Sequence, residues 1–77
     1  MIVMGKKDCP FCVRAVALLD SNNFEYTYID VEHNDESTER LKGLGIKTVP
    51  AIFLEDVFMG GYTELRGYIR AMTNEIK

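Results

Sequence analysis

Cys9 and Cys12 are the residues of this chain whose type and spacing could do chemistry, and they are its only two cysteines. Thiols at this spacing can close a disulfide and open it again, which is typical of a dithiol redox centre. A short apolar run precedes them and a helical pattern follows, so we expect Cys9 at the mouth of a helix. Unpaired backbone N–H groups and the helix dipole favour a thiolate there. Pro10 suits the first turn, where the helix does not need its missing N–H.

The same spacing could belong to half of a metal site or to a structural staple. A metal site would need two more ligands, and the only other good candidate is the single His33, which no motif surrounds. We interpret His33 as a solvated loop residue and expect no metal. Two cysteines this close in sequence cannot staple a fold as the disulfides of secreted proteins do. Redox chemistry is the favoured interpretation.

Length and composition indicate the class of protein. We expect residues 1–77 to form a single small domain of ordinary globular composition, with 47% hydrophobic and 27% charged residues. A formal net charge of -3 without a basic stripe argues against nucleic-acid binding. No stretch is long and apolar enough to span a membrane, and Met1 leads directly into an apolar run without a charged leader. We therefore expect a cytoplasmic protein, in a compartment where such a cysteine pair is more often catalytic than structural.

The first half of the chain predicts a strand, a helix and a strand. Residues 2–4 are apolar and precede a glycine. Between residues 10 and 20, apolar side chains recur at helical spacing, and the turn residues 21–23 end the pattern. Residues 24–31 are rich in aromatic and β-branched types, which favours a second strand. The two strands should be parallel, with a right-handed crossover.

The second half predicts a short helix, a hairpin and a closing helix. The helix should lie within residues 33–45, capped by Asn34 or Asp35 and ended by Gly43 or Gly45. Residues 51–54 and 57–59 are two apolar strands, and their two-residue link makes them antiparallel. After Gly60 and Gly61, apolar residues at helical spacing predict a closing amphipathic helix, with Thr63 as its N-cap. These apolar residues are Leu65, Tyr68, Ile69, Met72 and Ile76.

The order βαβαββα, with the cysteine pair at the first strand-to-helix junction, is the thioredoxin-like pattern. Over essentially its whole length the chain resembles a small dithiol glutaredoxin. The matching motifs are Cys9-Pro10-Phe11-Cys12, Thr48-Val49-Pro50, Gly60-Gly61 before the last helix, and Lys6 three residues before the first cysteine. The resemblance implies an α/β fold with a four-stranded mixed sheet flanked by three helices.

The resemblance also implies roles for individual residues. Cys9 would be the exposed nucleophile, and Cys12 the thiol that resolves the mixed disulfide. Pro50 would follow a cis peptide bond and face the cysteines, which leaves the backbone of Val49 free to pair with glutathione. Alternatively, Pro50 has no role in binding and begins the third strand after a trans peptide bond.

Further residues would bind glutathione. Lys6 would support the Cys9 thiolate and meet a glutathione carboxylate, and the less favoured alternative is an ordinary solvated lysine. Phe11 would form an apolar wall, and Thr48 would belong to the same site as part of its motif. The start of the last helix would present N–H groups to the γ-glutamyl carboxylate, and a helix N-terminus suits an anion. These groups belong to Gly61, Tyr62 and Thr63.

Three functional classes follow. The favoured one is a glutathione-dependent thiol-disulfide oxidoreductase that reduces protein disulfides and glutathione mixed disulfides, with glutathione as co-substrate and no permanently bound cofactor. The second is a hydrogen donor reduced directly by thioredoxin reductase, and Pro10 and Thr48 disfavour it by comparison with that group. The third is an iron–sulfur cluster carrier, which Pro10 and Cys12 disfavour. We expect a monomer that acts on disulfide-bearing client proteins. Ribonucleotide reductase is a frequent client of the family, but nothing in this sequence selects it.

Overall fold

The computed structural model describes residues 1–75 and has the element order that the sequence predicts. The strands are β1 (Ile2–Gly5), β2 (Thr27–Asp30), β3 (Ala51–Leu54) and β4 (Val57–Gly60), and the helices are α1 (Pro10–Ser21), α2 (Asp35–Gly43) and α3 (Tyr62–Glu75). A short 3₁₀ helix, η1 (Val31–His33), precedes α2. Ile76, which the sequence assigns to the last helix, lies outside the described residues.

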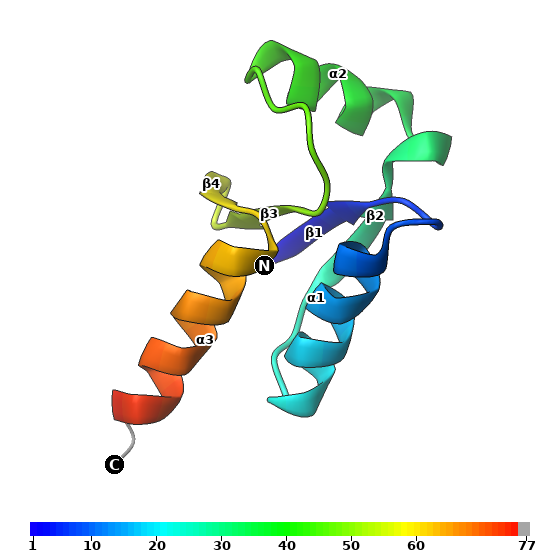
Figure 1. The fold of residues 1–77 in the computed structure, drawn as a ribbon. Helices are drawn as coiled ribbons and strands as arrows, with labels where there is room; N and C mark the ends of the chain where they lie inside the picture. The colour runs from blue at the N-terminus through cyan, green and yellow to red at the C-terminus, as the bar shows by residue number, and fades with distance from the viewer. Residues whose placement is uncertain (76–77) are drawn as a thin grey trace.

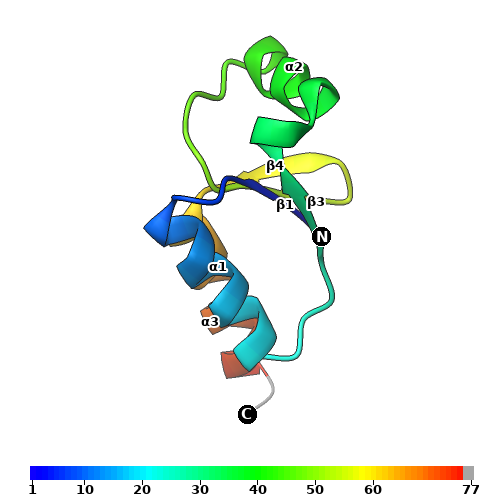
Figure 2. The same ribbon diagram turned by 90° about the vertical axis from the view of Figure 1, so that its right-hand side faces the viewer.

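The four strands form one mixed sheet in the order β2-β1-β3-β4. β1 pairs in parallel with β2 and antiparallel with β3, and β3 and β4 form the predicted hairpin. Glu55 and Asp56 both have positive φ values, of 50° and 67°, as in the two-residue turns whose twist suits a hairpin. Helices α1 and α3 cover one face of the sheet and α2 lies on the other (Figures 1 and 2). The predicted α/β fold, with three helices flanking a four-stranded sheet, is confirmed.

Alternate strand residues feed two separate apolar cores, because successive side chains of a strand point to opposite faces. Val3 and Ile52 pack toward α1 and α3, whereas Met4 and Phe53 pack toward α2. The first core also holds buried residues of both helices: Ala15, Leu19, Leu65 and Ile69. Helix α1 is thereby fixed on the sheet by its buried face, and its N-terminus is fixed with it.

The second strand is shorter than the predicted 24–31. Only Thr27 to Asp30 pair with β1, because β1 is itself only four residues long, from Ile2 to Gly5. Phe24 and Tyr26 pack against the α1–α3 core from the connecting segment, and Val31 begins η1. The aromatic residues that suggested a longer strand are therefore core residues outside the sheet.

The caps of the two later helices differ in how well the sequence predicted them. The Asn34 side chain accepts a hydrogen bond from the backbone N–H of Ser37 at 2.9 Å, so Asn34 caps α2 as predicted. The prediction of Thr63 as the cap of α3 is wrong. Helix α3 begins at Tyr62, and the Gly61 carbonyl accepts from the backbone N–H of Leu65 at 3.0 Å. Glu64 reaches back to accept the Gly61 N–H at 2.8 Å, which is the acidic half of a capping box.

The packing of α1 can be tested by truncating one buried side chain. Leu19 is fully buried in the α1–α3 core, so Leu19→Ala should lower the free energy of unfolding by about 2–5 kcal/mol. Val13 lies on the same helix but is 62% exposed, so Val13→Ala should change it by about 0.5 kcal/mol or less. Urea denaturation followed by circular dichroism measures both. Equal losses would contradict the assignment of the buried face.

Candidate active site

Cys9 is the N-cap of α1, and its sulfur is held by the helix that follows it. The backbone N–H of Cys12 donates a hydrogen bond to Cys9 Sγ at 3.1 Å, and Pro10 occupies the first helical position. The donor and the positive end of the helix dipole both stabilise negative charge on this sulfur. The helix-mouth position predicted for Cys9 is therefore confirmed.

The two thiols have different surroundings, but neither is open to solvent. Cys9 is 7% exposed and Cys12 is 1% exposed. The expectation of an exposed Cys9 is wrong in this respect, because Cys9 Sγ lies against the chain before β3, 3.7 Å from the Val49 carbonyl oxygen. The ranking of the two thiols by exposure nevertheless agrees with the prediction.

Cys12 is disfavoured as a thiolate. Burial is the largest of the effects that raise the pKa of Cys12 to about 11, and the hydrogen bond and charge of Cys9 act in the same direction. A backbone hydrogen bond with Lys6 and the Lys6 charge act in the opposite direction. The Lys6 charge therefore acts on the second thiol, a role that the sequence did not assign to it.

Val49 and Pro50 meet the cysteines from forty residues away in sequence. The Val49–Pro50 peptide bond is cis, as predicted, and Pro50 is buried. The Val49 carbonyl is the hydrogen-bond acceptor beside Cys9 Sγ. The Thr48-Val49-Pro50 motif and the cysteine motif thus form one site.

A groove of about 220 Å³ runs beside this pair, and we call it the Pro50 groove. It is lined by Phe11, Thr48, Val49, Pro50, Gly61, Tyr62, Thr63 and Glu64. These include every residue predicted to bind glutathione except Lys6. Phe11 is half exposed and packs against the Tyr62 ring, with ring centroids 5.7 Å apart, so the two rings form an apolar wall of the groove.

A second hollow adjoins the groove at Thr48 and Val49, and we call it the lysine cavity. It has a volume of about 370 Å³, and Lys6, Lys42 and Lys47 are among its lining residues. Lys6 therefore lies beside the Pro50 groove rather than in it. The three ammonium groups make this end of the site strongly cationic.

The N-terminus of α3 is only partly available to a ligand. The sequence assigned the N–H groups of Gly61, Tyr62 and Thr63 to an anion, but the Gly61 N–H is already bonded to Glu64. The backbone donors of Tyr62 and Thr63 remain the candidates there.

Sequence reasoning missed two residues of the site. Glu64 lines the Pro50 groove, and the signal for it was its place three residues after Gly61, the capping-box spacing. Arg14 holds its guanidinium 5.3 Å from the centre of the Phe11 ring, and the helical i, i+3 spacing could have indicated this contact.

No metal site was expected. Within residues 1–75, no three His, Cys, Asp or Glu side chains are grouped so that they could hold a metal ion. His33 lies at the surface, 3.8 Å from Asp30. In the same part of the chain no helix has the length and apolar character needed to cross a membrane.

A dithiol at the first helix of this fold, beside the segment that carries the cis Val49–Pro50 bond, is typical of thioredoxin-like thiol-disulfide oxidoreductases. Comparison with known proteins narrows the class. The family model described as Glutaredoxin matches residues 1–59. Glutaredoxin 1 of Escherichia coli strain K12 is 31% identical over 77 residues, which cover 90% of this chain and 91% of the relative. The chain belongs to the glutaredoxin family.

Solved structures agree in fold. The solution structure of a glutaredoxin from Brucella melitensis is 31% identical, with a TM-score of 0.74 over 96% of this chain and 82% of that one. A buckwheat glutaredoxin, solved as a complex with glutathione, has a TM-score of 0.77 at 24% identity and covers 92% of this chain and 68% of that one. The thiol-disulfide oxidoreductase activity predicted from the sequence is supported at this level.

The difference between the thiols can be measured by alkylation. Because the pKa of Cys12 is raised to about 11, Cys12 stays a neutral thiol through neutral pH and should be labelled only as the pH approaches that value. Cys9, with a donor at its sulfur, should react first. Iodoacetamide labelling at low conversion, with each cysteine read by peptide mass spectrometry across a pH series, measures this. Equal labelling of both at neutral pH would contradict the assignment.

Proposed function

We propose that this chain is a glutathione-dependent oxidoreductase that reduces protein disulfides and glutathione mixed disulfides through Cys9 and Cys12. Cys9 attacks the substrate disulfide, and either Cys12 or a glutathione thiolate resolves the mixed disulfide that results. Glutathione is a co-substrate in this scheme, and the clients are disulfide-bearing proteins. A reducing compartment such as the cytoplasm suits the reaction, since it keeps the dithiol reduced.

The observation that carries the proposal is the charge pattern along the Pro50 groove. Glutathione is a short peptide with its thiol in the middle, a carboxylate at one end, and a carboxylate with an ammonium at the other. Val49 lines the groove, and its carbonyl oxygen lies 3.7 Å from the Cys9 sulfur. The groove adjoins the lysine cavity on one side and ends at the N-terminus of α3 on the other.

Each end of the groove suits one end of the tripeptide. The ammonium groups of Lys6, Lys42 and Lys47 suit the glycyl carboxylate, since opposite charges attract at short range. The N–H groups of Tyr62 and Thr63 suit the γ-glutamyl carboxylate, as helix N-termini suit anions. The Glu64 carboxylate, one residue further on, suits the neighbouring ammonium. The backbone of Val49, which lines the groove, can pair with the peptide backbone between the two ends.

The roles of the two thiols separate in single mutants. Removal of glutathione from a target needs one protein thiol, whereas release of a protein client by the dithiol route needs both. Cys12→Ser should keep substantial activity on small glutathione mixed disulfides, lose most activity on protein disulfides, and leave a trapped adduct on non-reducing gels. Cys9→Ser should be inactive on both, because Cys12 is 1% exposed and has a raised pKa. An active Cys9→Ser with an inactive Cys12→Ser would mean that the roles are reversed.

The electron donor is tested with the same substrates. NADPH consumption is followed once with glutathione and glutathione reductase and once with thioredoxin reductase alone. We expect turnover in the first system. Turnover only in the second would contradict glutathione dependence and favour the hydrogen-donor alternative. A purified protein with visible iron–sulfur absorbance would favour the cluster carrier.

The lysine cavity predicts a salt-dependent KM. Lys47→Gln removes one exposed charge, so the KM for a glutathione mixed disulfide should rise about two- to fivefold, with less effect in high salt. Arg70→Gln removes an exposed charge on α3 that lines neither the groove nor the lysine cavity, and serves as the control. Equal KM values for the two variants would remove the lysine cavity from the binding site.

A further inference from the structure

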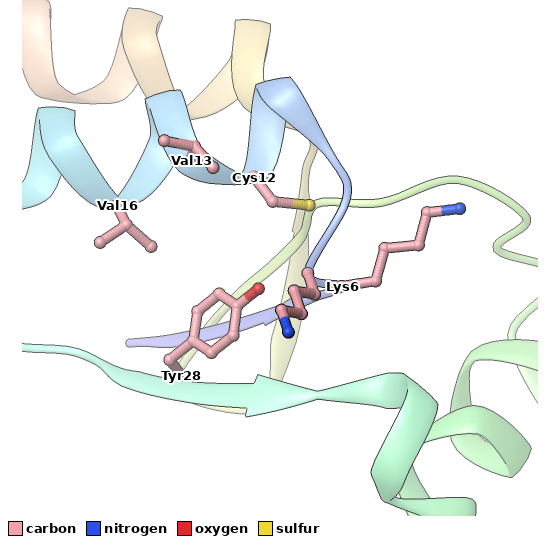
Figure 3. Close-up of a pocket in the computed structure, with 6 residues that line it drawn as sticks. Lys6, Cys12, Val13, Val16 and Tyr28 are labelled. Atoms are coloured by element: carbon pink, nitrogen blue, oxygen red, sulfur yellow. The ribbon is translucent and has the colours of Figure 1, made fainter.

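A further cavity is lined by Cys12 and shares no residue with the Pro50 groove; we call it the Tyr28 cavity. It has a volume of about 280 Å³ and is lined by Lys6, Lys7, Cys12, Val13, Val16 and Tyr28. Figure 3 shows the Cys12 sulfur on α1 and the Tyr28 hydroxyl on β2 facing the same space, with lysine side chains at its edge. Neither the thiol-disulfide chemistry nor the proposed glutathione site uses Tyr28.

Gly5 brings the hydroxyl and the sulfur together. It ends β1, between α1 and β2, and a Cβ atom built on it would lie 2.8 Å from Tyr28 Oη and 2.9 Å from Cys12 Sγ. Real Cβ atoms essentially never lie so close to other atoms, so any larger residue at this position would push one of them away. Both polar atoms therefore border the space that the missing side chain leaves.

The electrostatics of Tyr28 respond to the same sulfur. Burial first, and then the charge of Cys12, raise the pKa of the Tyr28 hydroxyl above its ordinary value. The hydroxyl therefore stays protonated at neutral pH and can act as a hydrogen-bond donor. A thiolate at Cys12 gains from such a donor in addition to its backbone hydrogen bond with Lys6, because burial disfavours the charged form.

We propose that Tyr28 serves the chemistry of the second thiol: when Cys12 is a thiolate, the Tyr28 hydroxyl turns to its sulfur and donates a hydrogen bond. In the resolving step Cys12 first gives its proton to water. Its thiolate then attacks Cys9 Sγ, the Cys9–Cys12 disulfide forms, and the bond from Cys9 to the client breaks. The client sulfur leaves with the electron pair. When a glutathione thiolate later attacks Cys9, Cys12 leaves as the thiolate, and the same hydroxyl stabilises it before water returns the proton.

The inference rests on the dithiol route proposed above and adds a residue to it. Tyr28 keeps its own proton throughout, so it is a donor and not an acid. Several charged or titratable groups act on the pair and would shape its pH dependence. Around Cys12 these are Cys9 and Lys6, and around Tyr28 they are Cys9, Cys12, Asp30 and Glu32, with Lys7 lining the shared cavity.

A chromogenic disulfide separates the two thiols in one experiment. One equivalent of dithiobis-nitrobenzoate should release its coloured thiolate in two phases, the first when Cys9 attacks and the second when Cys12 resolves the adduct. Tyr28→Phe keeps the ring and removes the hydroxyl. The second phase should become about three- to tenfold slower, because the lost hydrogen bond lowers the thiolate fraction of Cys12 more than the greater basicity of the thiolate raises its nucleophilicity. Its pH profile should move to higher pH. The first phase should not change.

Tyr26→Phe is the matched control, because its hydroxyl donates to Asp20 at 2.9 Å and does not line the Tyr28 cavity. Both phases should be unchanged in this variant. Unfolding midpoints of the two variants check that the fold is intact. An unchanged second phase in Tyr28→Phe, or an equal slowing of both phases, would overturn the proposal. Failure of the first phase in the unmutated protein would instead contradict the role of Cys9, so the two ideas fail separately.

Discussion

The site depends on one hydrogen bond, from the backbone N–H of Cys12 to the sulfur of Cys9. It exists because Cys9 occupies the N-cap of α1, where the first backbone donors of a helix have no partner within it. The donor can hold its position only if the helix does. Ala15 and Leu19, further along α1, are buried against the sheet and α3. This packing fixes the position of the helix and therefore the direction of the Cys12 N–H group.

The two thiols belong to different surroundings although three positions separate them. The Cys9 sulfur contacts the Val49 carbonyl, whereas Cys12 lines the Tyr28 cavity. The electrostatic neighbours of the second thiol are specific to it: the Lys6 charge acts on Cys12, and the charge of Cys12 acts on the Tyr28 hydroxyl. A glycine at position 5 is what allows β1 to pass so close to the second thiol.

Charge is unevenly spread over this acidic protein. The formal net charge is -3, yet Lys6, Lys42 and Lys47 share a cavity that adjoins the groove. Helix α2 therefore has two roles. Leu41 buries itself in the core on the second face of the sheet, and the adjacent Lys42 adds a charge to the site. The same packing that completes the fold brings Lys42 to the cavity that adjoins the Pro50 groove.

Local signals in the sequence predicted much of this fold. The helical spacing of Cys12, Ala15 and Leu19 located α1 and its buried face, and a two-residue link predicted the hairpin, because both depend on residues close in sequence. The cysteine spacing likewise predicted the chemistry, since a dithiol needs only two nearby thiols and a helix end.

Tertiary structure decided what depends on partners far away in the chain. The length of β2 is set by its pairing with the four residues of β1. The sequence of residues 24–31 carries no information about the length of that partner strand. Cys9 is buried because its sulfur contacts Val49, forty positions further along the chain. At α3, the Glu64 side chain bonds to the Gly61 N–H, and Thr63 is not the cap. Tyr28 gives no signal in the sequence, because its place beside Cys12 exists only when β1 lies between β2 and α1 with a glycine at the crossing.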